Sequence, residues 1–307
     1  MSEKRVCFDF DIAFSNGGGI QGQGFRLDIK GDDIGDEELA AYIIRDMRLL
    51  MVGEARILNK HIIEEAHKRK GDDTGPAIDQ GHITARGDRL VDLSHVIEAG
   101  MVTYKGLPAP LVCDHLSREA SRQAYAPGTE FQIGRIDMVG NTGTYIDVPF
   151  HRYPEGHDLA GLPLERCADL PAVLVRVEGT ATRAIDWHHF VPVECRGHAV
   201  LVHTGWDRNW GSERYFEGHP FLTEKAALYL RDQGALLVGI DSLNIDDTAG
   251  GTRPVHTVLL GAGIPIVEHL TGLAALPVEG FRFSAVPPKI AGMGTFPVGA
   301  HARLAAR

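Results

Sequence analysis

The sequence predicts an α/β fold preceded by a small α+β unit. Residues 172–177 and 199–203 are short runs rich in Val and Leu, which are typical of buried strands. Residues 223–240 contain a Thr-capped helix that ends at Gly234 and then a continuous apolar run, the repeating unit of an α/β sheet. Residues 6–14 and 25–29 alternate apolar and polar side chains, as half-buried strands do.

Length, composition and charge exclude several functional classes. A chain of 307 residues with 44% hydrophobic residues can bury a full core and carry an appendage. The formal net charge of −10, with no cluster of Lys and Arg, argues against a nucleic-acid partner. No apolar stretch approaches the roughly 18 residues of a membrane span, and no leader pattern is visible, so we expect a cytoplasmic location and no membrane partner. The four Cys are scattered and are expected to be buried thiols.

The N-terminal region is predicted to form a separate unit. The glycine-rich stretch 17–24 leads into a strand rather than a helix, so it predicts a hairpin loop and not a phosphate-binding loop. Asp36 predicts the start of a helix that runs to about Val52, with an apolar face formed by Leu39, Ile43, Met47 and Leu50. Residues 57–67 are ambiguous between strand and helix. One hairpin and one helix bury little apolar surface, so we expect this unit to dock on the main body or on another subunit.

The predicted boundaries are a unit at 1–70, a linker at 71–86 and a main domain at 87–307. In the main domain, residues 90–95 should form the opening strand, and residues 133–138 should form a strand that leads into the segment 141–151. The apolar run 236–240 delivers polar residues 241–246 at its carboxyl end, where ligands bind in α/β sheets.

The segment 141–151 has the composition of a site rather than of a core strand. If it is extended, its odd-numbered residues share one face. That face carries an amide, a phenol, a carboxylate and an imidazole, where a buried strand would carry branched apolar side chains. The four side chains are those of Asn141, Tyr145, Asp147 and His151.

The same segment resembles the HxGTHxDxPxH signature of the cyclase or kynurenine-formamidase-like hydrolases, metal-dependent enzymes that include arylformamidases and isatin-hydrolase-like proteins. The matching positions are Gly143, Thr144, Asp147, Pro149 and His151. The two signature histidines that ligate metal in the family fall on Asn141 and Tyr145. Further resemblance at residues 104–108, 203–207, 254–260, 266–270 and 286–300 extends the match over roughly residues 90–305. It implies a cyclase-like, swivelling β/β/α mixed sheet or barrel core with flanking helices.

The resemblance also implies a set of site residues. The family can bind two zinc or manganese ions that share the aspartate and the glutamate. Amide and phenol oxygens are poor replacements for imidazole, so one ion site is expected to be empty. The other is expected to hold one Zn or Mn ion through Asp147, His256 and Glu268. His151 corresponds to a general acid/base, a role that suits an imidazole, and Asp147 and Tyr145 are its expected catalytic neighbours. The expected substrate-binding residues are Tyr104, His95, Trp206 and Asn141.

These features predict a hydrolase that opens a small amide, formamide or lactam. One alternative is a metal-independent lyase, dehydratase or isomerase that uses Asp147, Tyr145 and His151 as acid/base groups. Another is a catalytically inactive protein that retains the pocket and binds a ligand. The expected partner is a small-molecule substrate, and the resemblance implies a homo-oligomer, either a dimer or a tetramer.

Overall fold

The computed structural model describes residues 3–15, 19–29, 31–46, 49, 52–65, 87–180 and 182–306. The chain divides into two compact units, and each is described by itself. The smaller unit comprises residues 1–75, 98–100 and 108–138, and the larger comprises residues 76–97, 101–107 and 139–307. The predicted linker, residues 71–86, lies outside the described residues. None of the described helices is both long enough and apolar enough to cross a membrane.

The smaller unit contains a three-stranded antiparallel sheet of β1 (Glu3–Phe14), β2 (Gly19–Asp28) and β3 (Val52–Glu65), with β1 in the centre. The two predicted strands are therefore joined by a third. Helix α1 (Asp36–Asp46) begins at the predicted residue, and its Leu39 and Ile43 are buried with Phe8 and Phe10 of β1. Leu39 and Ile43 are therefore covered within their own unit, in which β3 adds a third strand to the predicted hairpin.

Two N-terminal predictions are corrected. The helix was expected to reach about Val52, but α1 ends at Asp46 and Val52 begins β3. Residues 19–24, expected in the hairpin loop, belong to β2. In both places pairing with β1 outweighs local preference: β3 pairs with β1 over nearly its full length, and Ile20 lies opposite Ile12. Met47 and Leu50 lie outside the described residues.

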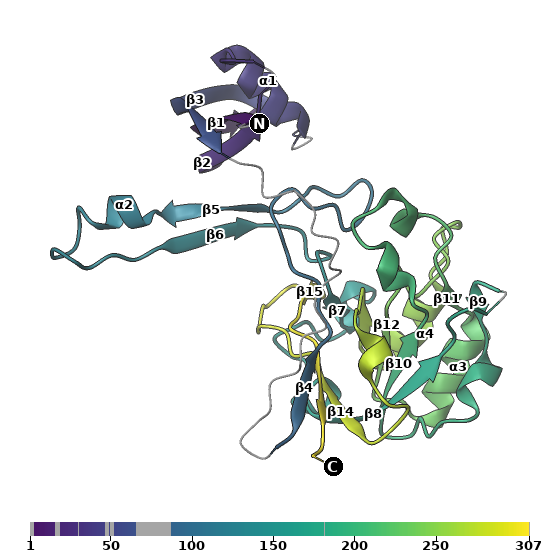
Figure 1. The fold of residues 1–307 in the computed structure, drawn as a ribbon. Helices are drawn as coiled ribbons and strands as arrows, with labels where there is room; N and C mark the ends of the chain where they lie inside the picture. The colour runs from purple at the N-terminus through teal and green to yellow at the C-terminus, as the bar shows by residue number, and fades with distance from the viewer. Residues whose placement is uncertain are drawn as a thin grey trace. The chain divides into compact units, whose positions relative to one another are not determined.

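A long hairpin of β5 (Leu111–Leu116) and β6 (Ile133–Asp137), with the short α2 (Arg118–Ser121) between its strands, completes the smaller unit (Figure 1). Strand β6 confirms the expectation of a strand at 133–138. It pairs with β5 and not with the sheet that carries the signature segment.

The larger unit is built on a nine-stranded mixed sheet with the order β15-β7-β13-β12-β10-β8-β14-β16-β4. Its strands are β4 (Arg89–Asp92), β7 (Tyr145–Asp147), β8 (Leu170–Arg176), β10 (Ala199–His203), β12 (Leu237–Ile240), β13 (Ile266–Glu268), β14 (Phe281–Ser284), β15 (Thr295–Pro297) and β16 (His301–Leu304). The four central strands β13, β12, β10 and β8 are parallel, and the outer strands are antiparallel to their neighbours. The fold class predicted from the sequence is confirmed.

Alternate residues of the central strands feed two cores. Leu174, Leu201 and Leu237 face one core, while their neighbours Val200 and Val238 face the other. The first core also takes residues from β4, β7, β14 and β16, so the sheet curls into a half-barrel around it. The second core is covered by α3 (Glu224–Gln233) and α4 (Pro254–Gly261), which lie on one side of the sheet (Figure 1).

The predicted ends of α3 are confirmed. Thr223 Oγ1 accepts a hydrogen bond from Ala226 N, and Gly234 ends the helix at φ +79°, a conformation that suits glycine. A two-stranded parallel sheet of β9 (Ala184–Ile185) and β11 (Phe221–Leu222) lies nearby in sequence. The short 3₁₀ turns are η1 (Pro149–His151), η2 (Leu164–Arg166), η3 (Trp187–Phe190), η4 (Trp206–Asn209), η5 (Glu213–Phe216) and η6 (Leu273–Ala275).

Candidate active site

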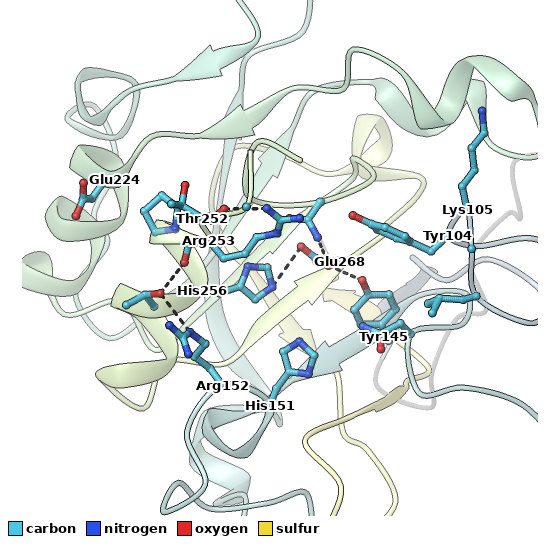
Figure 2. Close-up of a pocket in the computed structure, with 17 residues that line it drawn as sticks. Tyr104, Lys105, Tyr145, His151, Arg152, Glu224, Thr252, Arg253, His256 and Glu268 are labelled. Carbon is cyan, nitrogen blue, oxygen red and sulfur yellow. Dashed lines mark hydrogen bonds and ion pairs between the residues drawn. The ribbon is translucent and has the colours of Figure 1, made fainter. Parts of the chain in front are cut away.

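A cavity of about 1130 Å³ opens in the larger unit near the carboxyl ends of β12 and β13 (Figure 2). It is the kind of concave site that small-molecule enzymes use. Six of the residues singled out in the sequence line it: Tyr104, Asn141, Tyr145, His151, His256 and Glu268. The sheet brings several of them together, because Tyr145 pairs with Glu268 across β7 and β13.

The signature segment is not extended throughout. Only Tyr145–Asp147 forms a strand, and Pro149–His151 forms the 3₁₀ turn η1. The expectation that the odd-numbered residues of 141–151 share one face is therefore confirmed only for Tyr145 and Asp147, because residues 141–144 form bends and the turn follows Asp147. Gly294 permits this turn, because a Cβ on Gly294 would overlap the backbone of His151. The turn points the half-exposed His151 ring into the cavity (Figure 2).

Asp147 is fully buried, and its two carboxylate oxygens have different surroundings. Oδ1 accepts a hydrogen bond from Thr295 Oγ1. Within the part of the chain that the structure describes, Oδ2 accepts no hydrogen bond, and His256 Nε2 lies 3.5 Å from it. A buried carboxylate oxygen without a donor is costly unless a cation faces it, so Oδ2 is directed at a position suited to a positive charge.

Thr295 also fixes the orientation of the second histidine. Its hydroxyl oxygen lies 2.7 Å from His151 Nδ1. Because the single hydroxyl proton is donated to Asp147, the Thr295 oxygen accepts the Nδ1 proton of His151. This arrangement leaves Nε2 of His151 as the nitrogen with a free lone pair.

His256 is held from the opposite side by Asp246, which the sequence reasoning missed. Asp246 Oδ2 accepts hydrogen bonds from His256 Nδ1 at 2.6 Å and from His256 N at 3.0 Å, and Oδ1 accepts one from Val255 N at 2.7 Å. One carboxylate thereby caps the start of α4 and orients the imidazole. A sequence signal existed, since Asp246 ends the polar exit loop 241–246 and lies shortly before the Pro254 that starts the helix.

Charge controls the protonation of this histidine. Burial lowers the pKa of His256, but the carboxylates of Asp147 and Asp246 outweigh burial and raise the pKa to about 10. His256 Nε2 therefore carries a proton between Asp147 and Glu268 unless another cation replaces it.

Glu268 is fully buried at the end of β13 and accepts hydrogen bonds at both oxygens. Tyr145 Oη donates to Oε2 at 2.5 Å, and Ile245 N donates to Oε1 at 2.6 Å. Burial raises the pKa of Glu268, an effect that His256 opposes and Asp147 reinforces. Burial, Glu268 and Asp147 raise the pKa of Tyr145 well above its usual value, so Tyr145 stays a neutral phenol.

The donor set fits one metal ion better than two. Among the described residues, one ligand atom each from Asp147, His151 and His256 lie within 4.8 Å of one another, and Asp147 Oδ2 is the unpartnered oxygen of that group. At the other position Asn141 and Tyr145 offer only neutral oxygens, which are poor ligands for zinc. Glu268 Oε1 lies 3.8 Å from His256 Nε2, and its assignment as a ligand stays a prediction.

Two predicted substrate-binding residues do not line the cavity. His95 stacks on Trp210 with ring centroids 3.8 Å apart, and burial lowers the pKa of His95 to about 4. Trp206 Nε1 donates to Tyr215 O at 3.0 Å. The turn before Trp206 is fixed by the buried Asp241, which accepts hydrogen bonds from Thr204 and Gly205.

Comparison with known proteins places this geometry in a family. Residues 91–247 match the model of the "Putative cyclase" family. Kynurenine formamidase of Geobacillus thermodenitrificans is 31% identical over 157 residues, 48% of this chain and 72% of the relative. Kynurenine formamidase of Delftia acidovorans is 24% identical over 217 residues, 68% of this chain and 95% of the relative.

Solved structures agree with this assignment. A predicted metal-dependent hydrolase from Bacillus stearothermophilus superposes with a TM-score of 0.55 at 28% identity, covering 70% of this chain and 98% of that chain. Isatin hydrolase A from Labrenzia aggregata, bound to benzyl benzoate, shares the fold with a TM-score of 0.60 at 21% identity, covering 71% of this chain and 94% of that chain. The matched family model and the shared fold together show that this chain belongs to the cyclase family of hydrolases.

Proposed function

We propose that this protein is a hydrolase that cleaves the C–N bond of a small amide, formamide or lactam and uses one divalent metal ion, zinc or manganese. The observation that supports this best is that Asp147 Oδ2, which accepts no hydrogen bond among the described residues, faces Nε2 of His256, a residue that lines the cavity. The relatives add support, because kynurenine formamidase and isatin hydrolase are named for reactions at amide bonds.

Asp147, His256 and Glu268 would hold the ion. It would supply Lewis acidity toward the attacking water and the amide carbonyl. Asp246 keeps His256 Nδ1 protonated and hydrogen-bonded, so that Nε2 is the nitrogen directed at Asp147. Tyr145 holds Glu268 in place from the opposite side by donating to Oε2.

His151 would carry the proton from water to the leaving amine. Thr295 fixes its Nδ1, so Nε2 is left to accept and then return a proton in the cavity. This role depends on His151 not being a metal ligand, although its ring lies close enough to Asp147 and His256 for ligation.

The test loads purified protein with Zn²⁺ or Mn²⁺ and measures hydrolysis of formanilide, small lactams and isatin. The His151→Gln variant should retain its metal and lose turnover by about 10²- to 10⁴-fold, the range expected for loss of a general acid/base. Loss of the metal in this variant would make His151 a ligand, and hydrolysis of none of the substrates by loaded protein would refute the proposed reaction.

One observation favours a metal-independent acid/base reaction as the second candidate. The 2.5 Å hydrogen bond from the Tyr145 phenol to Glu268 places a proton between two groups at the cavity wall. A lyase or isomerase of this kind would keep full turnover after exhaustive chelation, whereas the proposed hydrolase would lose it.

A further inference from the structure

A second cavity of about 250 Å³ adjoins the first in the larger unit and has a cationic lining. It shares three residues with the main cavity, Tyr104, Lys105 and Arg253. We call it the cationic subsite, and it is lined by Tyr104, Lys105, Phe216, Leu243, Thr248 and Arg253. None of these six residues is acidic, although the whole chain has a formal net charge of −10.

Arg253 is the central charge of the cationic subsite. Its Nη1 donates to Gly250 O and to Thr252 O, each at 2.8 Å, and these bonds hold one terminal nitrogen of the guanidinium group in place. No described carboxylate lies within 4.0 Å of Arg253, so its charge is not neutralised by an ion pair within the part of the chain that the structure describes. The side chain extends across the cavity toward Tyr104 (Figure 2).

Tyr104 and Lys105 add donors around this guanidinium. Burial raises the pKa of Tyr104 and Glu268 reinforces that effect, while Arg253 opposes both, so Tyr104 remains a phenol with a proton to donate. Lys105 Nζ lies 5.2 Å above the Phe216 ring, 2.9 Å from Glu213 and 3.8 Å from Glu217, and both carboxylates are mostly exposed. An exposed ion pair of this kind is weak and can be replaced by a better anion.

We propose that the cationic subsite binds a carboxylate of the substrate, so that the enzyme acts on amides, formamides or lactams that also carry a carboxylate group. This inference rests on the proposed function of the main cavity. A planar guanidinium that no described carboxylate pairs with matches a substrate carboxylate in a two-point hydrogen bond, and the Tyr104 phenol and the Lys105 ammonium supply further donors. Phe216 offers an apolar surface beside the charge for the carbon skeleton.

Binding is tested by titration calorimetry on metal-loaded protein with slowly reacting acetanilides. The probes are 2-, 3- and 4-acetamidobenzoate, each compared with its uncharged carboxamide. At least one carboxylate should bind about 10- to 100-fold more tightly than its carboxamide, the range that hydrogen bonds to a charged group provide. Equal affinities in every pair overturn the proposal.

Variants locate the effect. Arg253→Gln should abolish the preference for the carboxylate, and Lys105→Gln should reduce it. Arg196→Gln, a surface arginine outside both cavities, serves as the matched control and should keep the full preference. Since Arg253 also holds the loop at 250–252, Tyr104→Phe and Lys105→Gln keep the test decisive if Arg253→Gln does not fold. A preference that survives in all of the folded subsite variants overturns the assignment.

The same experiment separates this inference from the proposed function. Turnover of formanilide and of the three formamidobenzoates is measured in parallel. Hydrolysis with equal efficiency for charged and uncharged substrates overturns the carboxylate subsite and leaves the hydrolase assignment intact. Selective binding of the acetamidobenzoates without hydrolysis of any formamide supports the subsite and overturns the hydrolase assignment.

Discussion

Replacing Asp246 by Asn tests how the fold presents His256 to the site. The carboxylate accepts three N–H groups: those of Val255 N, His256 N and His256 Nδ1. The amide of Asn has one accepting oxygen and places an NH₂ group at the other position, so at least one buried N–H loses its acceptor. The free energy of unfolding should fall by about 1–3 kcal/mol, the usual cost of a buried unsatisfied group.

The larger effect is expected on metal affinity. Without the charge of Asp246, the His256 ring loses both its fixed orientation and part of its basicity, and loss of such a partner typically weakens metal binding about 10- to 100-fold. The assay is competition with a chromogenic chelator, run beside urea unfolding. Asp247→Asn is the matched control: its Oδ1 accepts only from Ala249 N among the described hydrogen bonds, and its effect on stability should stay within about 0.5 kcal/mol. Unchanged metal affinity in a folded Asp246→Asn variant would refute the reasoning.

Three further predictions follow from the same geometry. The double substitution Asn141→His and Tyr145→His should restore the family ligands and raise the metal content by about one ion per chain. An unchanged metal content in the folded variant would show that these positions are not those of the missing ligands. Tyr145→Phe should destabilise the protein by about 1–3 kcal/mol, because the buried Glu268 loses its phenol donor, and a thermal or urea midpoint equal to the parent would contradict this. Burial raises the pKa of Asp241 from 3.8 to about 7, so the folded protein binds this proton more tightly than the unfolded chain does, and the resulting stability is lost as the pH rises between these values. The free energy of unfolding of Asp241→Asn relative to that of the parent should therefore increase from about pH 4 to 8, and a constant difference would contradict this.

Local sequence signals predicted the parts of the fold where local preference and burial agree. The strand at 199–203 and the helix between Thr223 and Gly234 were placed to the residue, because a cap, a C-terminal glycine and a run of branched apolar residues all indicate the same boundaries. The third N-terminal strand was not recognised as such, since its residues pair with β1 some 50 positions away and only that pairing decides strand against helix.

The candidate site was predictable in composition but not in arrangement. The resemblance identified Asp147, His151, His256 and Glu268 from their flanking residues. It could not show that His151 arrives through a 3₁₀ turn, which depends on the close approach of Gly294. Asp246 and Arg253 escaped notice because their importance comes from contacts with α4 and with the cavity, and a single Asp or Arg in a loop carries no distinctive pattern.

Metal-dependent turnover tests the central claim most directly. Purified protein is stripped with a chelator, titrated with Zn²⁺ or Mn²⁺, and measured for bound metal and for hydrolysis of formanilide, the formamidobenzoates and isatin at each point. The account predicts no turnover in stripped protein and activity that rises with metal to a plateau at about one ion per chain. Full activity in stripped protein, or a plateau at about two ions, would contradict it.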